Sequence, residues 1–485
     1  MMNAKTTTTF PTAALIGGDW VTSSKTFPVY DPATGDKLAD APNLTPADAQ
    51  RAIDAAYEAF PAWAAKPAKE RAKILRRWHD LILTEAEALA QLMTAEQGKP
   101  LIEARSEVAY GASFIEWFAE EGKRAYGHSI PTTAASRRFI TIKQPIGVCA
   151  AITPWNFPFA MITRKVGCAL AAGCTIVVKP SEETPLCALA VAKLAVDAGV
   201  PPGVVNVITT LDAAGVGKAL TADPRVRKLT FTGSTEVGKI LYRQSADTIK
   251  KLTLELGGNA PMIVFDDADL DRAIAGTMAS KFRNAGQTCV CANRILVQAG
   301  IYDRFVAALK KEVAKLYVAP GRDPKSTVGP LINADAIAKV KSLLTDATAH
   351  GAKIEVGGKS DSHGDLFFTP TIVTDVTPDM AIANEEIFGP VASIIRFETE
   401  ADAIRIANDT PYGLAAYLFS QNIGRAWRVA EALESGMVGV NEGLFSNEVA
   451  PFGGVKQSGL GREGAQEGLD EYLETKFLCL GGINA

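Results

Sequence analysis

Residues 147–158 read GVCAAITPWNFP, a short apolar run followed by a segment with two prolines. This stretch begins the part of the chain that decides the fold. Similar runs follow in CTIVVKP (174–180), VVNVITT (204–210) and RKLTFTG (227–233), with alanine-rich amphipathic segments between them. Strands that alternate with helices in this way are typical of a parallel, doubly wound sheet. The sequence therefore predicts an α/β protein.

The alternation restarts after Gly257, which predicts a second α/β domain. Its expected strands include PMIVFDD (261–267), ANRILVQ (292–298) and VASIIRF (391–397). We expect the first domain to comprise residues 1–126 and 146–257, and the second to comprise residues 258–460.

Residues 46–125, upstream of the first strands, read as three helical segments. Thr45 is the expected N-cap of the first, and Gly98 is expected to close the second. Two further segments fit neither domain: RRFITIKQPIG (137–147) and LETKFLCLGG (473–482). Both look like edge strands, which need partners, so we expect them to pair with each other or across a subunit interface.

Composition and charge narrow the classes of function. The formal charge of −4 arises from 50 basic and 54 acidic residues that are mixed along all 485 positions, so a nucleic-acid partner is not expected. The opening MMNAKTTTTF lacks the apolar region of a secretion signal and the arginines of an organellar leader, and we set it outside the fold. The longest nearly apolar run, Val166 to Val178, is too short to span a bilayer and suits a buried helix that leads into a buried strand.

Seven cysteines form an odd and unevenly spaced set. This pattern favours a reducing compartment, and we expect a cytoplasmic protein.

The stretch KFRNAGQTCVCANR (281–294) places Cys289 in a glycine-containing turn between a predicted helix and a predicted strand. A thiolate there would be a strong nucleophile toward a carbonyl carbon, although most free cysteines are small buried apolar residues. The four histidines all lie in polar contexts, so a carboxylate is the better candidate base. Glu255, in KLTLELGGNAP (251–261), stands at a leucine-rich strand end where burial would raise its pKa. A solvated strand-end carboxylate is the alternative.

Asn156 lies between the two prolines of TPWNFP (153–158), which fix the backbone around it. An amide held rigidly can donate a hydrogen bond to an oxyanion. The alternative role is an Asx-turn that satisfies its own backbone.

TPWNFP, LELGG around Glu255, FxNxGQxC around Cys289, EEIFGP (385–390) and PFGG (451–454) occur in this order along the chain. Together they resemble the aldehyde dehydrogenase superfamily, and the resemblance extends from IGGDW near the start to the terminal strand. It implies a doubly wound NAD-binding domain, a catalytic domain, and a small β oligomerisation element from residues 127–145 and 470–485. A homo-oligomer, either a dimer or a tetramer, is expected.

The resemblance also implies the chemistry. Cys289 would attack the aldehyde to form a thiohemiacetal, while Asn156 and the Cys289 backbone N–H hold the oxyanion. Hydride transfer to the nicotinamide would leave a thioester, and Glu255 would activate the hydrolytic water. No metal is required.

The cofactor is expected at FTGSTEVG (231–238), which follows a strand and opens a helix whose N-terminus can meet a pyrophosphate. GSTEVGKI nearly spells a P-loop, but Ile240 stands where that motif needs a hydroxyl. The resemblance places the following residues against the cofactor: Thr153, Pro154, Trp155, Lys179, Ser181, Glu182, Phe231, Gly233, Ser234, Val237, Leu256, Glu386 and Phe388. Glu182 would accept from both ribose hydroxyls and repel a 2′-phosphate, so NAD is preferred and NADP remains possible. Alternatively, Glu182 points to solvent.

Arg164 and Arg283 bear on the substrate, because guanidinium groups would make the pocket bind an anion. With Ser446 they resemble the carboxylate clamp of succinate-semialdehyde dehydrogenases, and Phe157 and Phe452 would wall the methylenes. We therefore expect oxidation of succinate semialdehyde to succinate, with glutarate semialdehyde or another short ω-carboxy aldehyde as the alternative. Cys291, two residues after Cys289, is a candidate redox partner of the nucleophile, or else a packing residue.

Overall fold

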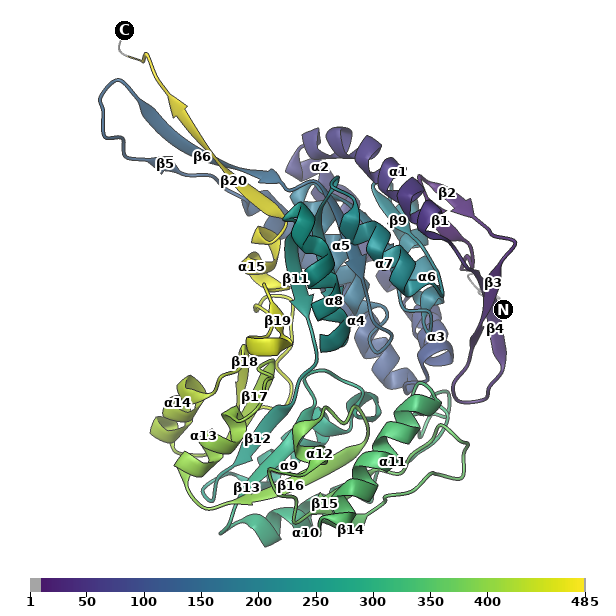
Figure 1. Cartoon of the computed structure of the whole chain (residues 1–485), viewed down its shortest axis with the longest axis vertical. Helices are drawn as coiled ribbons and strands as arrows, with labels where there is room; N and C mark the ends of the chain where they lie inside the picture. Colours follow the sequence, from purple (N-terminus) through teal and green to yellow (C-terminus); the bar gives the residue numbers. More distant parts are fainter. Residues whose placement is uncertain (1–9, 484–485) are drawn as a thin grey trace, which may run out of the picture.

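The computed structural model describes residues 10–483. Residues 1–9 of the predicted first domain and residues 484–485 of the predicted oligomerisation element lie outside the described part. Within that part the chain forms two α/β units, each built on one large sheet, and a long β-ribbon that projects away from them (Figure 1). The predicted α/β class with two sheets and a separate β element is confirmed.

The first unit holds an eight-stranded sheet with the strand order β19-β11-β10-β7-β8-β9-β1-β2. Its strands are β1 (Ala14–Ile16), β2 (Asp19–Val21), β7 (Val148–Ile152), β8 (Thr175–Lys179), β9 (Val205–Val207), β10 (Val226–Thr232), β11 (Lys251–Glu255) and β19 (Gly459–Leu460). The five central strands are parallel. The chain runs outward from β7 to β9 and then returns across β7 to β10, so the carboxyl ends of β7 and β10 flank a topological switch point, where open α/β sheets bind ligands.

The residues of β19 fall at the end of the segment that was expected to form the second domain, yet the strand pairs with β11 of the first sheet. Around this sheet lie α1 (Pro46–Ala65), α2 (Ala68–Thr84), α3 (Ala86–Gln97), α4 (Leu101–Glu121), α5 (Ala160–Ala172), α6 (Pro185–Asp197), α7 (Ala213–Ala222) and α8 (Thr235–Ser245). Smaller elements are β3 (Thr26–Tyr30), β4 (Lys37–Pro42), η1 (Gly122–Arg124) and η2 (Ala246–Thr248). The predicted passage from a buried helix into a buried strand is confirmed by α5 and β8.

Thr45 caps α1 through a capping box with Asp48, and Gly98 ends α3 in the left-handed conformation, as predicted. The prediction of three helical segments before residue 125 was wrong, because the second segment divides at Glu85 into α2 and α3. No glycine or proline marks the division. It accompanies a difference in tertiary packing: both helices lie against α4 and α6, but α2 also packs against α5, whereas α3 packs against β3.

The second unit holds a seven-stranded sheet with the order β14-β15-β16-β13-β12-β17-β18, parallel except at β14. Its strands are β12 (Ala260–Val264), β13 (Ala292–Gln298), β14 (Lys353–Val356), β15 (Thr371–Thr374), β16 (Val391–Phe397), β17 (Ala415–Phe419) and β18 (Met437–Val440). The helices after Gly257 are α9 (Leu270–Lys281), η3 (Arg283–Gly286), α10 (Tyr302–Val313), α11 (Ala334–Ala349), α12 (Ala381–Asn384), α13 (Glu400–Asn408), α14 (Ile423–Ala432), η4 (Lys456–Ser458) and α15 (Ala465–Asp470).

The ribbon consists of β5 (Ser129–Ile130), β6 (Arg138–Pro145) and β20 (Leu473–Leu480), and β20 runs outward toward its tip (Figure 1). β20 pairs antiparallel with β6 along its whole length, so the two edge segments pair with each other, which is the first of the two predicted alternatives. Among residues 10–483, no helix combines the length and the apolar character needed to cross a membrane.

Candidate active site

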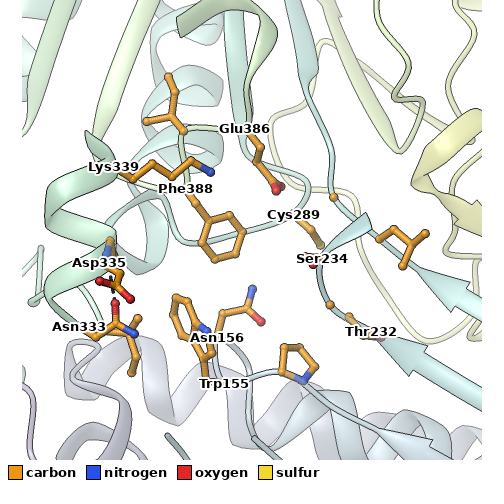
Figure 2. Close-up of a pocket in the computed structure, with 17 residues that line it drawn as sticks. Trp155, Asn156, Thr232, Ser234, Cys289, Asn333, Asp335, Lys339, Glu386 and Phe388 are labelled. Atoms are coloured by element: carbon orange, nitrogen blue, oxygen red, sulfur yellow. Dashed lines mark hydrogen bonds between the residues drawn. The ribbon is translucent and has the colours of Figure 1, made fainter. Parts of the chain in front are cut away.

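A cleft of about 370 Å³ opens beside the switch point of the first sheet, and the second unit closes its other side. Figure 2 shows Asn156 and Trp155 entering from the loop after β7, with Cys289, Glu386 and Phe388 facing them from the second unit. The cleft is lined by Pro154, Trp155, Asn156, Thr232, Gly233, Ser234, Leu256, Gly257, Cys289, Ile332, Asn333, Asp335, Ala336, Lys339, Glu386, Ile387 and Phe388. Two of the three predicted catalytic residues therefore share one cavity.

The loop before Cys289 is a left-handed turn. Asn284 and Ala285 have φ values of 51° and 54°, a conformation that residues other than glycine rarely adopt. The Asn284 amide compensates by donating to the backbone oxygen of Asn156 at 2.9 Å and to that of Gln287 at 3.2 Å. The Asn156 amide also donates to the Gln287 oxygen, at 3.0 Å. The nucleophile loop and the TPWNFP loop are thus tied together.

The second glycine of LELGG, Gly258, is required by a close approach of two backbone segments. A Cβ at this position would lie 2.5 Å from the backbone oxygen of Cys289, so only glycine lets the two segments approach this closely. Gly258 also donates its N–H to Glu386 at 3.1 Å.

Glu255 is 1% exposed at the end of β11, beside the cleft rather than on its lining. Neither of its carboxylate oxygens has a hydrogen-bond partner within the described residues. Burial and the nearby Glu463 carboxylate raise the pKa of Glu255 well above its ordinary value, although Arg164 and Lys165 oppose the shift. The protonated form is therefore favoured at rest.

Glu463, which sequence reasoning missed, balances the charges around Glu255. It lies 2.5 Å from Arg164 and also contacts Lys165 and Thr230. These cations outweigh burial and lower the pKa of Glu463, so ionisation is favoured at Glu463 over Glu255. No local pattern reveals Glu463, because its partners are 298 and 233 residues away.

Burial raises the pKa of the Cys289 thiol to about 12, and Arg164 opposes this shift only in part. The resting thiol is therefore protonated and needs a base to become a nucleophile. Cys291 is turned into the interior, where its thiol donates to the backbone oxygen of Lys281 at 3.4 Å.

Seven of the thirteen expected cofactor residues line the cleft: Pro154, Trp155, Gly233, Ser234, Leu256, Glu386 and Phe388. Ser234 is the N-cap of α8, so this helix directs its N-terminus at the cavity. Gly233 has no room for a side chain, because a Cβ there would lie 2.4 Å from the Phe231 ring.

Six expected cofactor residues are not part of the lining: Thr153, Lys179, Ser181, Glu182, Phe231 and Val237. Phe231 is buried beneath Gly233, and Val237 is exposed on α8. Glu182 pairs with Lys179 at 3.0 Å and lines a neighbouring cavity instead.

The start of α11 supplies cleft residues that sequence reasoning missed: Asn333, Asp335, Ala336 and Lys339. The residue type of Asn333 suits the N-cap that it forms on α11, but the neighbouring sequence does not show that this helix faces the first unit. Lys339 and Glu386 both lie on the side of the cavity opposite Trp155 and Asn156 (Figure 2). Burial raises the pKa of Glu386 to about 7, against the opposing effects of the Gly258 N–H and of Lys339.

The two predicted substrate arginines lie against aromatic rings. Arg283 stands 5.3 Å from the centre of the Phe157 ring, and Arg164 stands 4.5 Å from that of Phe452. In the described part of the chain the buried Nε of Arg283 has no hydrogen-bond partner. Ser446 does not line the Cys289 cleft but shares a smaller cavity of about 240 Å³ with Phe452.

The sequence and fold of the chain are similar to those of known proteins. The model of the aldehyde dehydrogenase family matches residues 20–478. A mitochondrial succinate-semialdehyde dehydrogenase of Arabidopsis thaliana is 60% identical over 475 residues, which cover 98% of this chain and 90% of the relative. A glutarate-semialdehyde dehydrogenase of Pseudomonas aeruginosa is 56% identical over 484 residues, covering 99% of this chain and 100% of the relative. The crystal structure of an E. coli NADP dependent enzyme has a TM-score of 0.96 and 57% identity, covering 97% of this chain and 98% of that one.

Proposed function

Since the chain belongs to the aldehyde dehydrogenase family, we propose that it oxidises a short aldehyde with a distal carboxylate, succinate semialdehyde foremost, to the acid with NAD(P). The observation that carries this proposal is the Arg283 guanidinium, which lies over Phe157 with a buried Nε that has no hydrogen-bond partner among the described residues. Arg164, over Phe452, is the second cation and is also paired with Glu463. Cations beside apolar walls suit a chain of methylenes that ends in a carboxylate. The names of the Arabidopsis and Pseudomonas relatives support the same class of substrate and keep glutarate semialdehyde as the alternative.

In the proposed reaction, the Cys289 thiol loses its proton to solvent and the sulfur adds to the aldehyde carbon, so that a thiohemiacetal oxyanion forms. The Asn156 amide and the Cys289 N–H donate to the oxyanion that develops. Oxidation leaves a thioester on Cys289. The ionised form of Glu255, which becomes populated as pH rises, takes a proton from the water that attacks this thioester, and the acid leaves as the Cys289 sulfur is released.

The cleft suits a dinucleotide, because α8 offers its N-terminus, Gly233 leaves the backbone open and Glu386 is a buried acceptor. When bound, NAD(P) supplies the hydride acceptor. The Ser234 end of α8 would meet its pyrophosphate and Glu386 would hold its nicotinamide ribose. Trp155 and Phe388, whose rings contact each other edge to face at 5.6 Å, would lie beside it.

The substrate assignment is tested by the rate of NAD(P)H formation with succinate semialdehyde, glutarate semialdehyde and butanal. A kcat/KM for succinate semialdehyde at least about tenfold above that for butanal, equivalent to ~1.4 kcal/mol, is the expected result. Equal values would leave the family assignment intact and remove the carboxylate clamp.

Arg283→Ala is expected to raise KM for the acid semialdehyde by about 10- to 100-fold, and to change KM for a neutral aldehyde of equal length far less. The reason is the loss of a charge-assisted hydrogen bond, worth roughly 1.5–3 kcal/mol. Arg272→Ala, at an exposed position of α9, is the matched control. Equal losses on both aldehydes would contradict the clamp.

Glu182→Ser is expected to raise the NADP/NAD ratio of kcat/KM by about tenfold, because it removes a carboxylate that would repel a 2′-phosphate. Glu182 is paired with Lys179 at 3.0 Å, so the same change would free this ammonium for the phosphate. Because the chain is similar to an NADP dependent enzyme, the same measurement on the unmodified protein decides between NAD and NADP. An unchanged ratio would mean that Glu182 does not contact the ribose.

We also propose a homo-oligomeric, cytoplasmic enzyme. Phe477 and Leu480 on the projecting ribbon are 55% and 48% exposed, and apolar side chains on a strand suit an interface with a second copy. Sedimentation analysis of the chain, compared with Phe477→Lys, tests the assembly.

A further inference from the structure

Three charged residues at the start of α4 contact the backbone of both loops that form the proposed oxyanion site. Lys99 lies just before the helix, and Glu103 and Glu107 follow at intervals of four, so both glutamates share one face of α4. Lys99 and Glu107 are 2% and 3% exposed and form an ion pair of 2.5 Å. We call these three residues the α4 ladder.

Lys99 and Glu107 hold the TPWNFP loop. The Lys99 ammonium donates to the backbone oxygen of Asn156 at 2.8 Å and stands 4.1 Å from the centre of the Phe157 ring. One Glu107 oxygen accepts the backbone N–H groups of Phe159 at 3.0 Å and of Ala160 at 3.2 Å. The backbone of Asn156 and the segment that directly follows it are therefore fixed.

Glu103 holds the other loop. It accepts the backbone N–H of Asn284 at 2.8 Å, within the left-handed turn that precedes Cys289. Asn284 in turn donates to the same Asn156 oxygen that Lys99 contacts. Because Asn284 belongs to the second unit, the ladder spans the junction between the units, where the first N–H of α4 also bonds to Gly321.

Stability alone does not account for this arrangement. Buried ion pairs contribute little net stability, and apolar residues of equal volume often replace them without loss. A displacement of about 1 Å between reacting groups, by contrast, can lower a rate by about 100-fold. We propose that Lys99, Glu103 and Glu107 are positioning residues that set the Asn156 amide relative to the Cys289 sulfur. The inference rests on the proposed function.

The test uses two reactions of Cys289 that need neither NAD(P) nor a semialdehyde. Acylation by p-nitrophenyl acetate develops an oxyanion, whereas alkylation by iodoacetamide does not, so their ratio reports on the oxyanion site. Lys99→Met/Glu107→Gln removes the donor to Asn156, leaves no buried charge in the pair and keeps an acceptor for Phe159. Arg105→Met is the control, because Arg105 lies on the same helix and its ion pair with Glu87 of α3 is exposed.

The double variant is expected to lose acylation by about 100-fold while alkylation at Cys289, located by peptide fragmentation, changes less than about threefold. Arg105→Met should keep both rates. If the double variant does not fold, Glu103→Leu replaces it, with Glu103→Gln as the variant that retains an acceptor and should restore acylation.

Unchanged acylation in a folded ladder variant, or equal losses of acylation and alkylation, would overturn the proposal. Wild-type acylation without NAD(P)H formation from any semialdehyde would instead remove the proposed function and leave the ladder in place. The two ideas can therefore fail separately.

Discussion

Cys289→Ala is expected to lower steady-state NAD(P)H formation by about 10⁴-fold or more, because no other described thiol lines the cleft and the covalent intermediate cannot form. The measurement is the rate of NAD(P)H appearance at saturating aldehyde. Thermal unfolding should be nearly unchanged, since alanine fits the space of the thiol.

Cys291→Ala is the matched control, two residues away and of the same type. Its thiol faces the Lys281 carbonyl in the interior, so the variant should retain activity within a few-fold. A comparable loss of activity in both variants would mean that the substitutions act by disturbing the loop and not by removing the Cys289 sulfur.

Glu255→Gln is expected to separate the two halves of the reaction. Thioester formation should survive as a burst of NAD(P)H, while the steady-state rate falls by about 10²- to 10⁴-fold because the hydrolytic water lacks its base. Rapid-mixing measurements of the burst and of the following rate test this result. Glu467→Gln, at an exposed position near Glu463, is the control.

The same variant should change the pH profile. Because the pKa of Glu255 is raised, its basic form becomes populated only above the ordinary range of a carboxyl group, so the wild-type steady-state rate should increase as pH rises. Glu255→Gln should lose this rising limb. A burst that disappears together with the steady state would place Glu255 before the thioester.

The features that could be predicted from the sequence are those set by residues close together along the chain. Thr45 and Gly98 could be assigned because caps and left-handed glycines act within one helical turn. The doubly wound order followed from alternating strands and helices, and Cys289 and Asn156 followed from their motifs.

The missed parts depend on contacts between distant segments. The break at Glu85 accompanies a difference in packing, and Glu463 gains its role only from Arg164 and Lys165 across the fold. Lys339 enters the cleft because α11 of the second unit closes it. The cofactor roles of residues outside the cleft lining, such as Glu182, stay predictions. The sequence around Glu182 does not show which cavity its carboxylate faces, and in the structure it lines a neighbouring one.

The pairing of β20 with β6 has a consequence for biosynthesis. β6 is made when roughly a third of the chain has been synthesised, but its partner comprises residues 473–480, and β11 likewise waits for residues 459–460. On the ribosome, β6 therefore remains an open edge that can pair with other nascent chains until almost all of this sequence has emerged. Removing residues 473–480 would leave that edge permanently exposed, and aggregation rather than a shorter enzyme is the outcome to anticipate.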